Sequence, residues 1–171
     1  MDMRPGSVVV MAERSAPGPL HVHAVALGPA EANAPVDAAL VTDAATPAPL
    51  DADSSEAVTL HEVRLAGLAA GTRYRYEVRG PGVDPVTGVF STPPLTPAPF
   101  RFAIYGDTRS DPQAHTAIVQ AVLRDGPDFA IHTGDLVEDG RDESLWQDFF
   151  TIEAPLLRNV PFVPVIGNHE Y

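Results

Sequence analysis

The residues best suited to chemistry lie in three short loops of the C-terminal part of the chain. The loops read Gly106-Asp107-Thr108-Arg109, Gly134-Asp135-Leu136-Val137 and Gly167-Asn168-His169-Glu170. They offer the carboxylates of Asp107 and Asp135, the amide oxygen of Asn168 and the imidazole of His169. Oxygen and imidazole donors of this kind bind hard and borderline metal ions. A single Gly-Asp is usually only a turn, but the three loops together predict a site for two metal ions.

Each loop follows an apolar run that is typical of a buried strand. These runs cover residues 100–105, 129–132 and 162–166, and the segments between them have the apolar spacing of helices. The order strand, helix, strand, helix, strand predicts a parallel sheet with crossover helices. Ligands of such sheets bind outside the carboxyl ends of the strands, so we expect all three loops to converge at one edge.

Capping residues predict where the two helices begin and end. Ser110 or Asp111 is suited to cap the first helix, and Gly126 followed by proline ends it. Asp142 is suited to cap the second helix. We expect Pro155 to interrupt this second helix and to begin another short helical piece, because proline lacks a backbone donor.

Phosphate esters resist hydrolysis because their oxygens repel an anionic nucleophile. Two metal ions about 3.5–4 Å apart overcome this repulsion by polarising the phosphoryl oxygens and generating hydroxide at neutral pH. Asp135 is suited to bridge such a pair, with Asp107 as a terminal ligand of one ion and Asn168 of the other. His169 would lie beside the phosphoryl group, where it could stabilise charge or protonate the leaving oxygen.

Residues 1–92 carry the pattern of an all-β sandwich. Several segments alternate between apolar and polar side chains and are rich in β-branched or aromatic residues. They cover residues 7–11, 20–27, 57–65, 74–79 and 86–91, with proline and glycine clusters between them. Residues 31–55 lack periodicity and are expected to form a loop or weak edge strands. His21, His23 and His61 are expected at ordinary strand positions, although a His-x-His pair can bind metal.

Residues 93–99 contain four prolines and predict a short, semi-rigid linker between the β-domain and an α/β domain at residues 100–171.

Composition narrows the classes of partner that the protein can bind. The net charge of −12 argues against nucleic acid as a general partner, because phosphate backbones need a basic surface. The absence of cysteine excludes disulfides and thiolate metal sites. No apolar run is long enough for a signal peptide or a membrane span, so we expect a soluble chain whose localisation the sequence leaves open.

The three loops resemble the first three sequence motifs of the calcineurin-like metallophosphoesterases, and the loop at residues 167–170 is the most specific. Residues 68–74 resemble the turn before strand F of fibronectin type III domains, although Ala70 stands where that family usually has proline. There Tyr74 would close a tyrosine corner by hydrogen-bonding to upstream backbone. A fibronectin type III-like domain before the metal loops resembles the layout of purple acid phosphatases and their bacterial relatives.

The resemblance implies a role for each site residue. Asp107 would bind the first metal ion, Asp135 would bridge the two ions, and Asn168 would bind the second. His169 would assist at the phosphate. The two ions would be iron, manganese or zinc.

Two positions depart from the family pattern. Arg109 stands where many members have a histidine ligand, and a guanidinium is a poor ligand because it keeps its proton. Arg109 is therefore expected to contact the substrate phosphate, to orient Asp107, or to form only a surface or structural ion pair. Glu138 stands where purple acid phosphatases carry a tyrosine, and it could be either a metal ligand or a solvated loop carboxylate.

Hydrolysis of phosphate monoesters is the leading functional hypothesis. A phosphodiesterase of the same superfamily and a non-catalytic binding module are the alternatives. The family supplies further histidine ligands downstream, whereas this chain ends at Tyr171. We therefore expect a fragment, incomplete at both ends, that needs the C-terminal half of the catalytic domain as a partner and does not hydrolyse phosphate esters alone.

Overall fold

A computed structural model describes residues 6–14, 20–28, 35–38, 46–49 and 57–171 of the chain. The chain divides into two compact units, Met1–Ala98 and Pro99–Tyr171, and each has its own secondary structure and core. The border between the units lies within the proline-rich residues 93–99. None of the helices in the described residues is long and apolar enough to cross a membrane.

The first unit consists of two antiparallel sheets, with strand orders β1-β5-β4 and β3-β2-β6-β7. Its strands are β1 (Ser7–Arg14), β2 (His21–Ala26), β3 (Pro35–Ala38), β4 (Thr46–Pro49), β5 (Ala57–Ala66), β6 (Arg73–Gly80) and β7 (Val83–Ser91). Alternate side chains of both sheets form one apolar core, which includes Val8, Val22, Val63, Tyr74 and Phe90. This shared core makes the unit a β-sandwich.

All five predicted strands of the first unit are present. Two further short strands, β3 and β4, lie at sheet edges within residues 31–55, where a loop or weak edge strands were expected. The rest of that stretch lies outside the described residues. His21 and His23 lie in β2, and His61 lies in β5, where it is buried.

The turn before β6 contains the predicted tyrosine hydrogen bond. The backbone N–H of Ala69 donates to the hydroxyl of Tyr74 over 2.7 Å, and Tyr74 is 2% exposed. The Thr92 hydroxyl closes the same turn by donating to the Ala69 carbonyl over 2.6 Å. Gly71 has φ of +62°, a conformation that favours glycine over residues with a Cβ.

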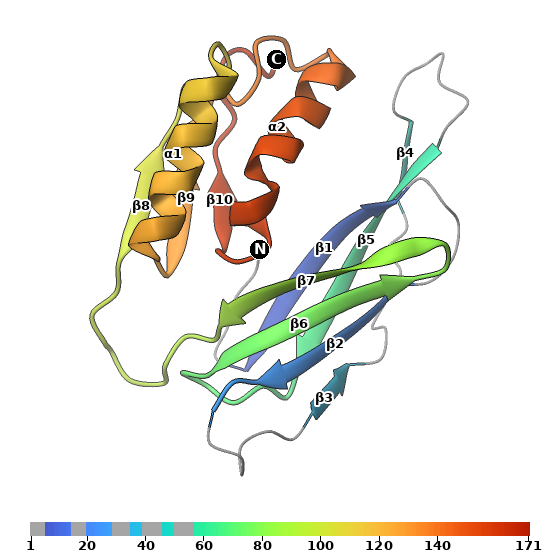
Figure 1. The fold of residues 1–171 in the computed structure, drawn as a ribbon, viewed down its shortest axis with the longest axis vertical. Coiled ribbons are helices and arrows are strands. Elements are labelled where there is room, and N and C mark those ends of the chain that lie inside the picture. Colours follow the sequence, from blue (N-terminus) through green and yellow to red (C-terminus); the bar gives the residue numbers. More distant parts are fainter. Residues whose placement is uncertain (1–5, 15–19, 29–34, 39–45, 50–56) are drawn as a thin grey trace. The chain divides into compact units, whose positions relative to one another are not determined.

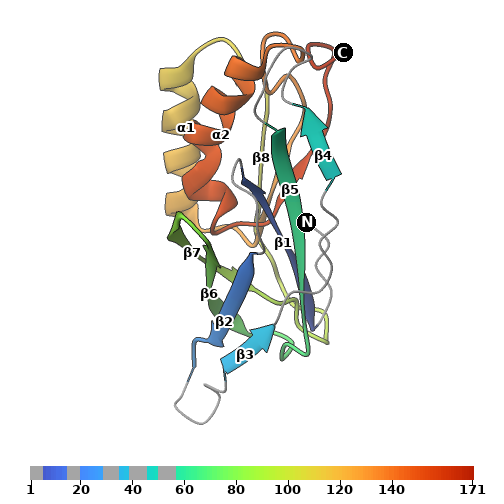
Figure 2. The same cartoon turned by 90° about the vertical axis from the view of Figure 1, so that its right-hand side faces the viewer.

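The second unit has the predicted order of strands and helices. Its three strands are parallel in the order β10-β9-β8, and its elements are β8 (Phe102–Tyr105), α1 (Pro112–Asp125), β9 (Phe129–His132), α2 (Glu143–Leu157) and β10 (Phe162–Pro164). Both helices cover the same face of this sheet (Figures 1 and 2). The core between them contains Val119 of α1, Ala130 of β9 and Leu156 of α2. On β8, Phe102 and Ile104 are exposed, while Ala103 and Tyr105 pack against the core.

The predicted helix caps of the second unit are confirmed. The Asp111 carboxylate accepts the backbone N–H groups of Gln113 and Ala114 at 3.0 Å, and Gly126 ends α1 in the left-handed conformation. The Asp142 carboxylate accepts the N–H of Ser144 over 2.9 Å at the start of α2.

The prediction that Pro155 interrupts the second helix is wrong. Helix α2 runs through Pro155 to Leu157 without a break. Pro155 lies in the last turn, so its missing N–H removes only one helical hydrogen bond near the end. Burial of Glu153 and Leu156, both 0% exposed, holds this turn against the sheet.

Candidate metal and phosphate site

Two aspartates at the carboxyl ends of neighbouring strands share an unusual backbone conformation. Asp107 follows β8 and Asp135 follows β9, and both have φ of 55°. This left-handed region costs free energy for residues with a Cβ, although aspartate tolerates it better than most. Such conformations persist where the surrounding structure enforces them, and they concentrate at functional sites.

Hydrogen bonds join the first loop to the second. The backbone N–H of Asp107 donates to the Gly134 carbonyl over 3.1 Å, and that of Thr108 donates to the Asp135 carbonyl over 3.1 Å. Close packing joins the second loop to the third. A Cβ on Gly134 would lie 2.9 Å from the Cα of Gly167, so both positions need glycine. The structure therefore brings the three loops together at one edge of the sheet.

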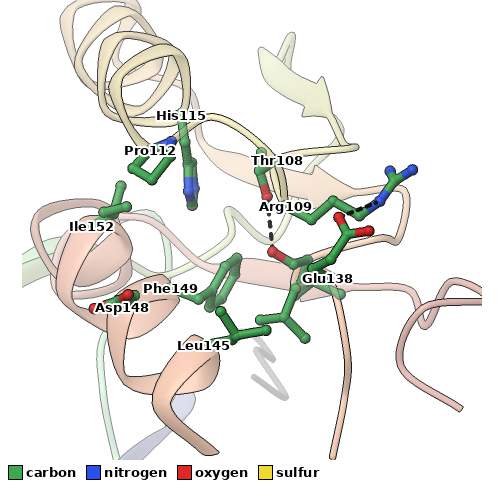
Figure 3. A pocket seen from close by; sticks show the side chains of 11 residues that line it. Thr108, Arg109, Pro112, His115, Glu138, Leu145, Asp148, Phe149 and Ile152 are labelled. Atoms are coloured by element: carbon green, nitrogen blue, oxygen red, sulfur yellow. Dashed lines mark hydrogen bonds and ion pairs between the residues drawn. The ribbon is translucent and has the colours of Figure 1, made fainter. Parts of the chain in front are cut away.

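The carboxylates of Asp107 and Asp135 converge on one positively charged atom. The Nη1 nitrogen of Arg109 lies 2.9 Å from Oδ1 of Asp107 and 3.1 Å from Oδ2 of Asp135. Its Nε nitrogen lies 3.2 Å from Oε2 of Glu138 (Figure 3). This contact is an ion pair, because the N–H does not point at the oxygen closely enough for a hydrogen bond. Three acidic side chains thus surround one guanidinium.

The carboxylate of Glu170 holds the second and third loops together. Its Oε2 accepts the N–H of Gly167 over 2.6 Å and that of Asp135 over 3.1 Å. Its Oε1 accepts the N–H of Val137 over 3.1 Å. Residue spacing gives no sign of this role for Glu170, because two of these partners precede it by more than thirty residues.

His169 is fixed by the second loop. Its Nδ1 lies 2.7 Å from the backbone carbonyl of Glu138, so this nitrogen carries a proton and donates it. Nε2 is the ring nitrogen left for other partners. The backbone N–H of His169 also donates to Oδ1 of Asp135 over 3.4 Å. Asn168 is exposed and lies between Gly167 and His169, both of which contact Asp135 or its loop.

A buried chain of hydrogen bonds lies beneath the first two loops, and the sequence analysis missed it. His132 is 0% exposed, its Nδ1 accepts the N–H of Gly134 over 3.2 Å, and its Nε2 lies 3.0 Å from the Thr108 hydroxyl. The hydroxyl donates to the Leu136 carbonyl over 3.4 Å, so Nε2 of His132 must donate to it. Burial lowers the pKa of His132, with nearby Glu153 opposing the shift, which favours this neutral tautomer.

A second buried cluster anchors both helices to the strand that leads into the first loop. Glu153 of α2 accepts a hydrogen bond from the Tyr105 hydroxyl over 2.8 Å and lies 2.7 Å from Nε2 of His115 on α1. Burial, together with the carboxylate of Glu153, raises the pKa of Tyr105 well above its usual range, so Tyr105 keeps its proton. Helical spacing places Glu153 on the apolar face of α2 with Phe149 and Leu156, but a glutamate there gives no sign of its partners, which lie on other elements.

A small hollow lies beside Arg109. It has a volume of about 50 Å³, and Thr108, His115, Glu138 and Phe149 are among the residues around it (Figure 3). Ligand pockets usually measure about 300–1,000 Å³, so this hollow has room for water but not for an ester substrate.

The donor set fits a cation. Arg109 acts as a stand-in ion, because one of its nitrogen atoms contacts both carboxylates that were predicted to bind metal. Within residues 57–171 and the other described segments, no group of three or more His, Cys, Asp or Glu side chains is arranged to hold a metal ion. Asn168, the third predicted ligand, would add an amide oxygen to the two carboxylates. The chain therefore presents an incomplete set of ligands for a cation.

Comparisons with known proteins assign the second unit to a family and give relatives of the chain. Residues 100–171 match the calcineurin-like phosphoesterase family. Two uncharacterized proteins of Mycobacterium tuberculosis, from strains CDC 1551 / Oshkosh and ATCC 25618 / H37Rv, are each 28% identical over 139 residues. The match covers 70% of this chain and 26% of each relative, so the chain spans about a quarter of their length.

Two solved structures share the fold over nearly the whole chain. Purple acid phosphatase PPD1 from yellow lupin (Lupinus luteus) seeds superposes with a TM-score of 0.66 at 19% identity, covering 99% of this chain and 34% of that one. PhoD superposes with a TM-score of 0.60 at 12% identity, covering 98% of this chain and 37% of that one. At these identities the likeness shows a common fold.

Proposed function

We propose that residues 100–171 supply ligands to a two-metal site that hydrolyses phosphate esters, with phosphate monoesters as the substrates. The observation that carries this proposal is the convergence of Asp107 and Asp135 on one cationic atom at the carboxyl edge of a parallel sheet. The match to the calcineurin-like phosphoesterase family and the fold shared with a purple acid phosphatase support it.

Asp135 is proposed as the bridging ligand, because its carboxylate lies between the first and third loops. One of its oxygens contacts Arg109 of the first loop, and the other accepts the N–H of His169 in the third. Asp107 and Asn168 are proposed as terminal ligands of the two ions, which would be iron, manganese or zinc. The bound ions would polarise the phosphoryl oxygens and strengthen water as a nucleophile at neutral pH.

His169 is proposed to protonate the leaving oxygen. The Glu138 carbonyl binds Nδ1 and thereby fixes the orientation of the ring, so that Nε2 can carry the proton that is transferred. Arg109 is proposed to hold the two carboxylates together before metal binds and to bind phosphate oxygens in the metal-loaded site, for which a planar guanidinium is suited. Glu138 is proposed to act as an exposed loop carboxylate paired with Arg109 rather than as a metal ligand.

The first unit is proposed to be a fibronectin type III-like domain. Its two antiparallel sheets and the hydrogen bond from Ala69 to the Tyr74 hydroxyl support this assignment. Its role would be structural, because the chemistry-bearing loops all belong to the second unit.

The test combines metal binding with hydrolysis. When joined to the C-terminal half of the catalytic domain, the chain should bind Mn²⁺ or Zn²⁺ and hydrolyse p-nitrophenyl phosphate faster than bis(p-nitrophenyl) phosphate, whereas the chain alone should hydrolyse neither ester. Asp135→Asn should remove both activities, whereas Asp128→Asn, which changes a carboxylate at the opposite edge of the same sheet, should preserve them. Faster cleavage of the diester would make the protein a phosphodiesterase. Metal binding that Asp135→Asn does not change would contradict the proposed site.

A further inference from the structure

Arg109 lies where three acidic side chains of the candidate site meet. Its Nη1 touches the carboxylates of Asp107 and Asp135 at 2.9 and 3.1 Å, and its Nε lies 3.2 Å from Glu138. The Asp135 side chain is only 15% exposed and that of Arg109 24% exposed, so water screens this contact incompletely. A guanidinium keeps its charge at any accessible pH, so Arg109 is a permanent cation at this position.

The position of Nη1 is also the position that a metal ion would need. An ion held between the same two oxygens, Oδ1 of Asp107 and Oδ2 of Asp135, would compete with the guanidinium for both of them. Two like charges cannot share that space, and arginine cannot lose its proton to become a ligand. Arg109 and a metal ion therefore cannot occupy the space between these two oxygens at the same time.

We propose that Arg109 holds the cation position between Asp107 and Asp135 in the metal-free protein, and that a metal ion must displace it to bind. This inference rests on the proposed function, because it requires a metal ion at these two carboxylates. Arg109 is thus a positioning residue that keeps the carboxylates together before the ion arrives. Ion pairing with Glu138, which is 56% exposed, offers the guanidinium a place to stay after displacement.

Displacement has a measurable consequence for metal affinity. A ligand that binds only the open form of a protein has an apparent affinity reduced by the fraction of molecules in that form. Removing the competing cation should therefore tighten metal binding. In the absence of metal, removing the Arg109 charge should destabilise the site, because the clustered carboxylates would repel one another without the guanidinium.

The experiment compares Mn²⁺ binding to the metal-free chain and to Arg109→Gln by isothermal titration calorimetry. Arg141→Gln is the matched control, because Arg141 is an exposed arginine that pairs with Asp139 at 2.9 Å in the second loop region. Both variants lose one positive charge near the site. Arg109→Gln should bind Mn²⁺ about tenfold more tightly than the unmodified chain, a change of one decade in Kd. Arg141→Gln should show little change.

The outcomes separate this inference from the proposed function. Equal or weaker Mn²⁺ binding by Arg109→Gln would overturn displacement and leave the metal site intact. Equally tight binding by both variants would show a general charge effect, which also overturns it. If neither the unmodified chain nor Arg109→Gln binds Mn²⁺, the proposed metal site fails, and the displacement fails with it.

A second measurement follows metal binding in the unmodified chain, so its result does not depend on the metal affinity of a variant. The Nε–H signal of Arg109 can be followed by NMR during addition of Zn²⁺ and assigned by its loss in Arg109→Gln. Displacement should move this signal as the ion saturates the site. A signal that stays in place while Zn²⁺ binds would overturn the proposal.

Discussion

Asp107 and Asp135 show how single residues make this site at a cost in backbone energy. Both adopt the left-handed backbone conformation. Backbone hydrogen bonds join Asp107 to Gly134, and join Thr108, the residue after Asp107, to Asp135. The strand pattern predicted that these two residues converge, because it places them at one sheet edge, and their role as metal ligands stays a prediction. It could not predict that Arg109 bridges them, since an arginine reaches many positions from the same backbone site.

The Glu170 carboxylate is expected to position the bridging ligand. It accepts N–H groups from Asp135, Val137 and Gly167, so Glu170→Ala would leave these donors without their acceptor. We expect metal affinity to fall by about 10–100-fold, as is usual when a group that supports a metal ligand is removed. Isothermal titration calorimetry measures this change, and hydrogen exchange of the three amides should accelerate.

Asp128→Asn is the control for Glu170, because Asp128 also accepts a backbone N–H, from Arg101 over 2.8 Å, but at the opposite edge of the sheet. It should leave metal affinity unchanged. Retention of metal affinity in Glu170→Ala would show that the second and third loops hold their shape without this carboxylate.

His132 should make the second unit less stable in acid. Burial lowers its pKa in the folded state below the ordinary 6.5. Between the lowered pKa and 6.5 the unfolded chain binds more protons than the folded one, so stability rises with pH in this window. The free energy of unfolding should therefore be fully present above about pH 6.5 and fall as the pH drops below it.

An NMR titration of the His132 ring measures this shift directly. The folded protein should show a midpoint below that of the same histidine in the urea-unfolded chain. A folded midpoint equal to or above the unfolded one would contradict the assignment of a buried neutral ring donating to Thr108.

At the scale of helices and strands, features that depend on neighbouring residues were predictable, whereas features that depend on packing between elements were not. The caps Asp111, Gly126 and Asp142 were predictable because each satisfies backbone groups only a few residues away. The continuation of α2 through Pro155 was not predictable, because it depends on burial of Glu153 and Leu156 against another element. The pairing of Glu153 with Tyr105 and His115 depends on the same packing.

Glu153 is expected to be the main polar anchor of α2. Glu153→Ala would leave the Tyr105 hydroxyl and Nε2 of His115 buried without their acceptor and would open a cavity. We expect the second unit to lose about 3 kcal/mol or more of stability. Glu153→Gln should lose less, because its amide oxygen can still accept one of the two hydrogen bonds.

Urea unfolding followed by the fluorescence of Trp146, which lies on the same helix, measures these losses. Glu143→Gln is the control in the first turn of α2, where the side chain is only partly buried, and it should change stability by less than about 0.5 kcal/mol. A similarly small effect of Glu153→Ala would mean that apolar packing alone holds α2 in place.

At the scale of the whole chain, the two units have separate cores. Among the described residues, the core cluster of the first unit consists of residues before 99, and the two clusters of the second unit consist of residues after 99. The hydrophobic pattern and the prolines predicted this division. Strands and helices have different hydrophobic periods, and the proline-rich linker shows neither period. The strand bounds were less predictable, since β1 and β7 extend beyond their most apolar segments.

Separate cores predict two unfolding transitions that respond to different changes. Tyr74→Phe removes the acceptor of the Ala69 N–H and should lower only the transition of the first unit, by about 1 kcal/mol. Mn²⁺ at about one hundred times its Kd should raise only the transition of the second unit, by about 2.7 kcal/mol. Differential scanning calorimetry of the chain, with and without Mn²⁺, resolves the two transitions. Asp135→Asn should abolish the response to Mn²⁺ while preserving the response to Tyr74→Phe. A single transition that both changes move would show instead that the two units unfold as one cooperative body.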